Sequence, residues 1–339
     1  MAFSVLEIPG QVDNHNLGRV IGECFRSQIN TAVKRRKEDL GPTNYNKLTE
    51  ASKNYAAITQ THLPSIMDEI EGTAFGAKID FLDAFLLCCH ELYDPSEQEH
   101  CTTIAGHEPG DKRILGHNED WPLPEGSPNP LYLLKATIQE SASLVYSIIS
   151  LCYPDELMGT AVTMNDSGLI LAVNSIETNN IHPGVPRIVL SRAITRCQTI
   201  KQSVDLINET PRASGYNFIL AQNDKLVNVE VAGEDIEVET APLGLWVHTN
   251  HFATPKMQKH GKEPSTQSLA RYERASKLAR FPMTVTDMKA ALSDNEGPSP
   301  ILNDGTLASV VTIPAEKILY VRQNKPVLGE FEEHHFRST

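Results

Sequence analysis

The stretch Cys101-Thr-Thr-Ile-Ala-Gly106, followed by Glu108-Pro-Gly-Asp-Lys112 and Ile114-Leu-Gly-His-Asn-Glu-Asp-Trp121, decides how the rest of the sequence is interpreted. Proline and glycine in the middle segment supply the fixed and the permissive φ angles that a tight connection needs. The stretch therefore predicts two short antiparallel strands joined by a turn. Such a hairpin places the thiol of Cys101 at one end and the carboxylate of Asp120 on the neighbouring strand.

Cys101 can be interpreted in two ways. A cysteine outside a disulfide is most often a small buried hydrophobe. As a thiolate it is a strong nucleophile, but it needs a base within hydrogen-bonding reach, and the hairpin offers no obvious one. Cleavage of the bond between His100 and Cys101 would supply a base, because the new α-amino group has a reference pKa of roughly 7.7–8.0. The preceding segment, Asp94-Pro-Ser-Glu-Gln-Glu-His100, is polar and turn-forming, as cleavable segments usually are.

Four segments in a fixed order extend this pattern: Cys101-Thr-Thr, Gly116-His-Asn-Glu-Asp-Trp121, Asn165-Asp-Ser-Gly-Leu169 running into Val173-Asn-Ser175, and His248-Thr-Asn-His-Phe252. Together they resemble the acyl-CoA:isopenicillin N acyltransferase family of N-terminal-nucleophile hydrolases. That family includes hydrolases of β-alanyl amines such as β-alanyl-dopamine and carcinine. The resemblance implies a four-layer αββα sandwich of the α+β class and no cofactor. It also implies a helical propeptide at residues 1–100, retained as a small subunit, and a catalytic large subunit at residues 101–339.

The resemblance also implies a double role for Cys101. Its thiol would first attack the carbonyl group of His100, and hydrolysis of the resulting thioester would cut the chain. The same thiol, activated by its own amine, would then attack the amide of a substrate and carry the acyl group. The aspartate that matches Asp120 fixes the amine and thiol of the nucleophile in the family, although an aspartate near a strand end often caps a turn.

Three further residues match family positions. Asn250 matches the donor that stabilises the tetrahedral oxyanion, and Asn174 matches a second amide that faces the nucleophile. Arg271 matches an arginine that supports the site. Read alone, such asparagines are typical of turns, and an arginine on a helix is usually solvated. Weaker candidates are Arg274, His90 and Glu91.

The substrate and the reaction are predicted from the same pattern. His117 stands where bile-salt and penicillin amidases have arginine, and Gly-His-Asn-Glu-Asp resembles the β-alanyl-amine hydrolases instead. We expect an amidohydrolase that cleaves small N-acyl or N-β-alanyl amines. The alternatives are an acyl-CoA-dependent N-acyltransferase at the same site, a papain-like enzyme with a separate histidine, and an unprocessed binding protein. The papain-like alternative is disfavoured because Cys101 leads into a predicted strand and the papain signature around the cysteine is absent.

The composition and net charge exclude some classes of binding partner. With 339 residues, 40% of them hydrophobic, the chain can bury a sizeable core in one or two domains. A net charge of −13 argues against binding to nucleic acid or to anionic membranes. No apolar run reaches the roughly 20 residues that span a bilayer, and the absence of a secretory signal predicts a cytoplasmic protein. No metal site is expected, because His248 and His251 in one strand would point to opposite faces.

The apolar periodicity predicts helices first and mixed structure afterwards. Helices are expected at 18–37, at 45–70 and from 72 onward, with Asp80 as a cap for the segment 80–92. Beyond the hairpin we expect strands at 131–137, 144–152, 159–164, 169–173, 217–221, 226–232, 246–248, 307–313 and 317–321, and helices at 187–197, 199–208, 268–279 and 285–292. This order predicts α+β layers.

Overall fold

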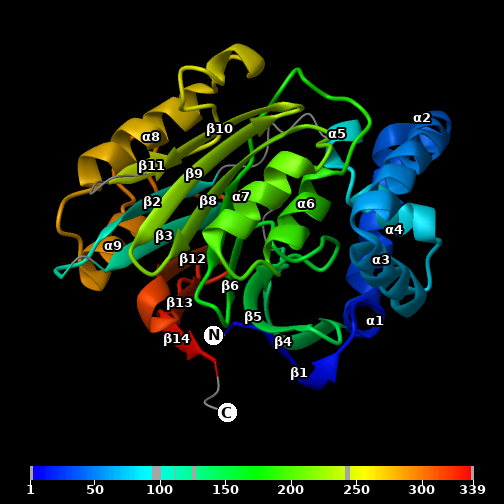
Figure 1. Ribbon diagram of the computed structural model, residues 1–339. Coiled ribbons are helices and arrows are strands. Elements are labelled where there is room, and N and C mark those ends of the chain that lie inside the picture. The colour runs from blue at the N-terminus through cyan, green and yellow to red at the C-terminus, as the bar shows by residue number, and fades with distance from the viewer. Residues whose placement is uncertain (1–2, 94–100, 111, 124–126, 241–244, 337–339) are drawn as a thin grey trace.

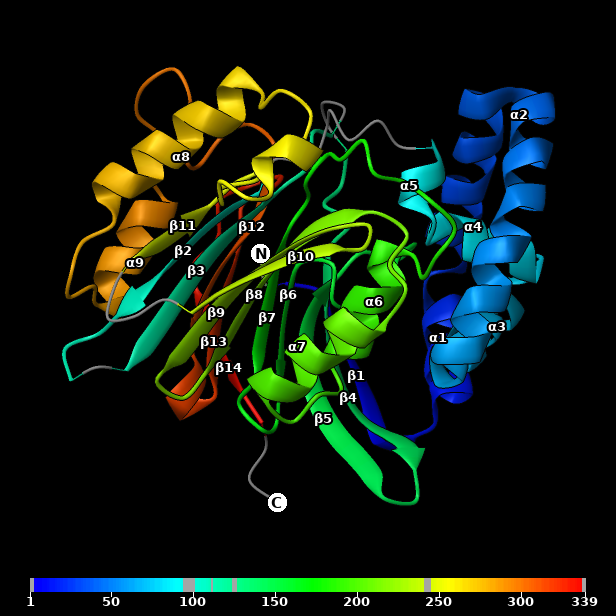
Figure 2. The same cartoon turned by 45° about the horizontal axis from the view of Figure 1, so that its top comes forward.

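The computed structural model describes residues 3–93, 101–110, 112–123, 127–240 and 245–336. Two β-sheets are stacked on each other, and helices cover the outer face of each (Figures 1 and 2). The α+β class and the four-layer αββα arrangement that the resemblance implies are thereby confirmed. His100 and the expected cleavable segment 94–100 lie outside the described residues.

The larger sheet has eight strands. Their order is β1 (Val5–Val12), β4 (Tyr132–Ser141), β5 (Leu144–Cys152), β6 (Val162–Asn165), β7 (Ile170–Asn174), β8 (Gly215–Gln222), β9 (Lys225–Ala232) and β10 (Asp235–Thr240). Neighbours are antiparallel, except that β1 runs parallel to β4. β1 and β10 were not predicted, and β1 adds a strand to the first 100 residues, for which only helices were expected. The run around β1 contains Pro9, which an edge strand tolerates and which obscures a strand pattern.

The smaller sheet has six strands and contains the predicted hairpin. Their order is β11 (Trp246–His248), β2 (Thr102–His107), β3 (Arg113–Asp120), β12 (Thr306–Ile313), β13 (Ile318–Gln323) and β14 (Glu332–His335). β2 and β3 are antiparallel, with Thr103 opposite His117, so the hairpin is confirmed. β14 was not predicted. β11 ends at His248, so His251 lies beyond the strand that we expected to hold both histidines.

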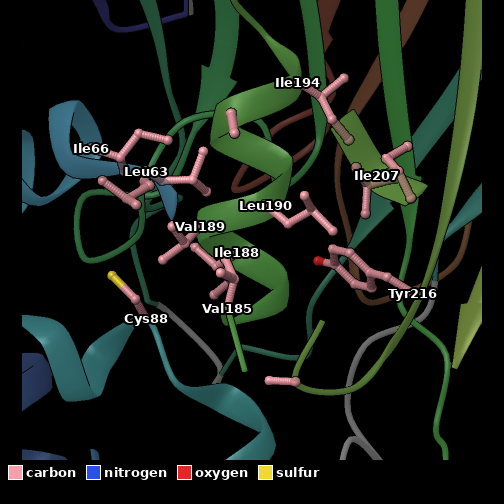
Figure 3. Close-up of a cluster of buried hydrophobic side chains, with 14 of the residues drawn as sticks. Leu63, Ile66, Cys88, Val185, Ile188, Val189, Leu190, Ile194, Ile207 and Tyr216 are labelled. Carbon is pink, nitrogen blue, oxygen red and sulfur yellow. The ribbon is translucent and has the colours of Figure 1, made fainter. Parts of the chain in front are cut away.

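Three layers of apolar side chains hold the elements together. Residues of both sheets, including Leu115, Ile149 and Val310, form the core between them. The helices α6 (Arg187–Ile194) and α7 (Ile200–Glu209) cover the larger sheet, and α8 (Thr266–Leu278) and α9 (Val285–Leu292) cover the smaller one. Two short 3₁₀ helices, Gln258–His260 and Pro314–Glu316, lie in connections. Figure 3 shows Ile188 and Val189 of α6 beside Leu63 and Ile66.

Five helices form the rest of the N-terminal region: α1 (Asn14–Cys24), α2 (Arg26–His62), α3 (Pro64–Ala77), α4 (Phe81–Leu87) and α5 (His90–Tyr93). The predicted boundaries differ because Phe25 separates α1 from α2 and proline starts α3, where its missing N–H costs no helical hydrogen bond. A residue with φ of 68°, Gly41, kinks α2. Asp80 precedes α4, but its side chain makes no capping hydrogen bond.

Among the described residues, no helix is both long and apolar enough to cross a lipid bilayer. The cytoplasmic location stays a prediction.

Candidate active site

The Cys101 thiol lies one residue before β2, directly beside a carboxylate. Its Sγ is 3.7 Å from Oε2 of Glu119 on β3. Two further groups hold that carboxylate: the hydroxyl of Tyr153 donates to Oε1 at 2.8 Å, and Nε2 of His117 lies 3.0 Å from Oε2. Because Cys101 and Glu119 are nearly fully buried, these contacts fix the thiol and the carboxylate against each other.

A second set of contacts joins the two sheets behind the thiol. The hydroxyl of Thr103 donates to Oδ1 of Asn174, at the end of β7, over 2.8 Å. The same hydroxyl lies 2.8 Å from Nδ1 of His117. Nδ2 of Asn174 is buried and has no hydrogen-bond partner among the described residues. A buried amide donor without a partner is costly, so this group is available to an additional acceptor.

Arg271 on α8 ties Cys101 to the segment after β11. Its Nη1 donates to the carbonyl oxygen of Cys101 at 2.7 Å and to Oγ1 of Thr102 at 2.8 Å. Its Nη2 donates to Oδ1 of Asn250 at 2.8 Å, and Nδ2 of Asn250 donates to the carbonyl oxygen of Ser175 at 3.1 Å. The amide of Asn250 is thus oriented from both ends. Burial lowers the pKa of Arg271, while the charges of Asp120 and Cys101 oppose that shift.

Asp120 has different partners from those of Glu119, as expected for consecutive strand residues that point to opposite faces. Its Oδ2 accepts a hydrogen bond from Nδ2 of Asn303 at 2.8 Å. Burial raises the pKa of Asp120 to about 7, against the positive charge of Arg271 and the hydrogen bonds from Thr306 and Asn303. Asp120 therefore lies on the side of the hairpin that faces Arg271.

A buried glutamate anchors the segment that carries Asn250. Oε1 of Glu230 accepts from the backbone N–H of Ala253 at 2.7 Å and lies 2.8 Å from Nε2 of His248. His251 is held elsewhere, with Nδ1 2.8 Å from Oγ of Ser268. These hydrogen bonds shape the turn and thereby hold Asn250 toward Arg271.

The thiol faces a cavity of about 460 Å³. On the side of the thiol, Cys101, Glu119, Tyr153 and Ser175 contribute to its wall. The other side is formed by helix residues and by the connection after β5, including Arg35, Arg36, Asp39, His90, Asp155 and Glu156. A cavity of this size suits a small molecule.

The structure brings together most of the predicted site. Asn174 and Arg271 are linked by hydrogen bonds to Cys101 or to its neighbours on β2, Asn250 is linked to them through Arg271, and Asp120 lies near Arg271. Among the weaker candidates, His90 lines the cavity, whereas Arg274 pairs with Asp294, with Nε 2.9 Å from Oδ2. The catalytic roles of these residues stay predictions.

Sequence reasoning missed Glu119, Tyr153 and Thr103. Glu119 could have been found from the hairpin register, because an antiparallel pairing that continues from Thr102 opposite Asn118 puts Glu119 opposite Cys101. Tyr153 follows β5 in the other sheet, and no sequence signal connects it with Glu119.

Among the described residues, Cys101, His117 and Glu119 form a group that could hold a metal ion. One donor atom from each lies within 4.8 Å of the other two. A thiolate, an imidazole and a carboxylate suit Zn²⁺. An ion bound there would cover the thiol of Cys101. The thiol can therefore act either as a nucleophile or as a metal ligand, but not as both at once.

Comparison with known proteins agrees with this geometry. The family model described as acyl-coenzyme A:6-aminopenicillanic acid acyl-transferase matches residues 107–326, which is well over half of the chain. The chain belongs to this family. It is also 24% identical, over 264 residues, to the beta-alanyl-dopamine/carcinine hydrolase of Drosophila melanogaster, covering 69% of this chain and 67% of that protein. These matches place the protein among enzymes that make or break amide bonds, and the recognised family is confirmed.

Solved structures with similar folds include amidases. The N-acylethanolamine-hydrolyzing acid amidase ortholog of Caenorhabditis elegans is 18% identical, with a TM-score of 0.47, covering 63% of this chain and 93% of that one. Penicillin V acylase from Agrobacterium tumefaciens is 14% identical, with a TM-score of 0.46, covering 66% and 83%.

Proposed function

We propose that the protein is a self-processing cysteine amidohydrolase that cleaves the amide bond of a small N-acyl or N-β-alanyl amine. The observation that carries this proposal is the Cys101 thiol at the wall of a 460 Å³ cavity, in a site tied together by Arg271 and Asn250. The similarity to a hydrolase of β-alanyl-dopamine and carcinine supports the substrate class.

Processing comes first in this proposal. The Sγ of Cys101 adds to the carbonyl carbon of His100, the peptide C–N bond breaks, and the acyl group moves to sulfur. Water then hydrolyses the thioester. The products are the fragments 1–100 and 101–339, and Cys101 gains a free α-amine that can accept the thiol proton.

Turnover uses the same atoms. The thiolate of Cys101 adds to the amide carbonyl of the substrate, and the oxyanion receives hydrogen bonds from Asn250 and Asn174. Asn250 uses one amide hydrogen for Ser175 and retains a second, and Nδ2 of Asn174 has no partner among the described residues. The amine leaves with the proton held by the α-amine, and water releases the acid from sulfur. Asp120 and Arg271 position the nucleophile, and no cofactor is needed.

Acyl transfer is a second candidate, because the matched family is described as an acyl-transferase. In that reaction an amine replaces water in the last step, or an acyl-CoA thioester charges Cys101. Access of water to the acyl-enzyme decides between the two outcomes.

The proposal is tested by incubating the purified protein with N-β-alanyl and N-acyl amines. The released amine is quantified by mass spectrometry, and acid-quenched protein is searched for an acyl adduct on Cys101. We expect turnover and an adduct in the wild type and neither in Cys101→Ala. Cys24→Ala is the matched control, since Cys24 is exposed and does not line the cavity of Cys101. Equal turnover in Cys101→Ala would contradict the proposal.

A further inference from the structure

We propose that Glu119 is the cation-binding group of the acyl subsite, so that the enzyme selects acyl groups with an ammonium two carbons from the carbonyl. This inference rests on the amidase function proposed above and deepens it. The preferred substrates would then be β-aminoacyl amides. Glu119, next to the proposed nucleophile Cys101, would select charged acyl groups over neutral ones.

The first support is the position of the Glu119 carboxylate. Its Oε2 lies 3.7 Å from the attacking Sγ of Cys101, and the side chain lines the cavity. A carbonyl carbon ready for attack lies about 3–3.5 Å from the nucleophile. In a β-aminoacyl group, standard bond lengths put the amino nitrogen about 3–4 Å from that carbon. An ammonium there is within ion-pairing reach of a carboxylate that borders the thiol.

The second support is that Glu119 is held in place before any substrate binds. The hydroxyl of Tyr153 donates to Oε1 at 2.8 Å, and His117 contacts Oε2 at 3.0 Å. A charged group in a buried wall binds an opposite charge more strongly than one in water, and a fixed side chain loses little entropy on binding. Glu119 therefore presents its charge at a defined distance from the reacting carbon.

The third support is the charge of the whole cavity wall. Four carboxylates, from Asp39, Glu119, Asp155 and Glu156, line the cavity, against two guanidinium groups from Arg35 and Arg36. Arg35 is 3.7 Å from Asp39 on an exposed stretch of α2, and the guanidinium of Arg36 stacks 3.7 Å from the Tyr93 ring. Glu156 also has the ring of His90 at 3.4 Å. Acidic groups thus exceed arginines by two. Burial raises the pKa of Asp155, but the other three carboxylates still outnumber the two arginines, so this wall attracts a cation.

The fourth support comes from two buried hydroxyls in the same wall. Oγ1 of Thr160 and Oγ of Ser175 have no hydrogen-bond partner among the described residues. Both residues line the cavity and are more than nine-tenths buried, with exposed fractions of 6% and 4%. Unpaired buried hydroxyls are costly and are expected to be satisfied by a polar ligand. They favour a polar acyl group over a purely apolar one.

The test compares two amides of the same amine, one N-β-alanyl and one N-butyryl. Butyryl has a methyl group where β-alanyl has its ammonium, and the chain length is equal. We expect wild type to prefer the β-alanyl amide at least tenfold in kcat/KM. Glu119→Gln should abolish most of that preference, mainly by raising KM for the β-alanyl amide, and Glu119→Asp should restore part of it. Glu237→Gln, whose side chain pairs with exposed Lys256, should leave the preference unchanged.

A binding measurement separates this inference from the proposed function. Calorimetry on processed wild type uses non-cleavable ketone analogues of the two amides, in which a CH₂ group replaces the amide NH, so that it needs no turnover. It should give tighter binding of the β-alanyl analogue than of the butyryl analogue, and the difference should vanish in processed Glu119→Gln. Equal binding, or an unchanged preference in Glu119→Gln, would overturn the cation subsite even if amides are cleaved. Absence of turnover and of an acyl adduct would instead contradict the amidase proposal.

Discussion

Nη2 of Arg271 donates to Oδ1 of Asn250 over 2.8 Å while Nη1 of the same side chain donates to the carbonyl oxygen of Cys101 over 2.7 Å. One guanidinium thus fixes both the proposed nucleophile, Cys101, and the proposed oxyanion donor, Asn250. Loss of an oxyanion donor costs about 3–4 kcal/mol of transition-state stabilisation. We expect Arg271→Ala to lower kcat by about 10²–10³-fold, measured in steady-state assays.

Arg274 provides the matched control for this prediction. It lies one turn further along α8, but it pairs with Asp294 outside the site. Arg274→Ala should keep kcat within about twofold, because partly exposed ion pairs contribute little. Equal losses of kcat in both variants would show that kcat depends on the integrity of α8 and not on the contacts of Arg271.

The raised pKa of Asp120 leads us to expect that the free energy of unfolding depends on pH. Its pKa is raised to about 7 by burial, from 3.8 in the unfolded chain. The folded state therefore holds a proton on Asp120 that the unfolded state has released between these pH values. Its contribution to stability is fully present below pH 3.8 and is lost as the pH rises through about 7.

The measurement is urea unfolding of wild type and Asp120→Asn from pH 4 to pH 8. The variant cannot titrate at this position, so the free energy of unfolding of wild type relative to Asp120→Asn should fall across this range by as much as a few kcal/mol. A difference that is constant with pH would contradict the raised pKa.

The buried ion pair of Glu69 on α3 leads us to expect that the two fragments stay together after cleavage. Its Oε2 accepts from Nε of Arg192 at 2.7 Å, and both side chains are almost fully buried. Glu69 belongs to the expected small subunit and Arg192 to the large one. Removing one partner leaves a buried charge, so Glu69→Ala should cost about 3–5 kcal/mol. Glu71→Ala, an exposed position on the same helix, should cost far less.

Size-exclusion chromatography and thermal melting check this prediction. Processed wild type should elute as one complex, because β1 of the first fragment also pairs with β4 of the second. Glu69→Ala should melt at a lower temperature or release the small fragment. Separation of the wild-type fragments without denaturant would contradict a retained propeptide.

At Gly18 the helices α1 and α3 pack so closely that there is no room for a larger side chain. A Cβ atom on Gly18 would lie 1.9 Å from the carbonyl oxygen of Glu69, which is backbone and cannot move aside. Glycine-to-alanine changes in helices usually raise stability by about 1 kcal/mol. Here we expect Gly18→Ala to lower the melting temperature, as followed by circular dichroism. An equal or higher melting temperature would mean that the two helices separate at little cost.

The sequence was most informative where structure is local. The hairpin of β2 and β3 was predicted because its turn residues lie within one short stretch, between the two segments that form the strands. β1 was missed because its only neighbour among the described strands is β4, far along the chain, and because a proline interrupts its pattern. The division at Pro64 was missed because apolar periodicity continues across it, although proline marks the start of α3.

Only those site residues that match positions of the family pattern were predicted from the sequence. Cys101, Asn250 and Arg271 were identified from matching positions, and the structure joins them through Arg271. Glu119 was visible in the sequence beside Asp120, but its neighbour Tyr153 comes from the other sheet. Contacts between sheets depend on how the layers stack, and no local pattern encodes that stacking.

The most direct test of the account is the intact mass, under denaturing conditions, of freshly purified wild type beside Cys101→Ala. We expect two wild-type species whose masses sum to the full chain plus one water, with Cys101 as the new N-terminus, and a single full-length species in the variant. A single full-length mass in both proteins, or cleavage that persists in Cys101→Ala, would contradict the assignment of Cys101 as a self-generated N-terminal nucleophile.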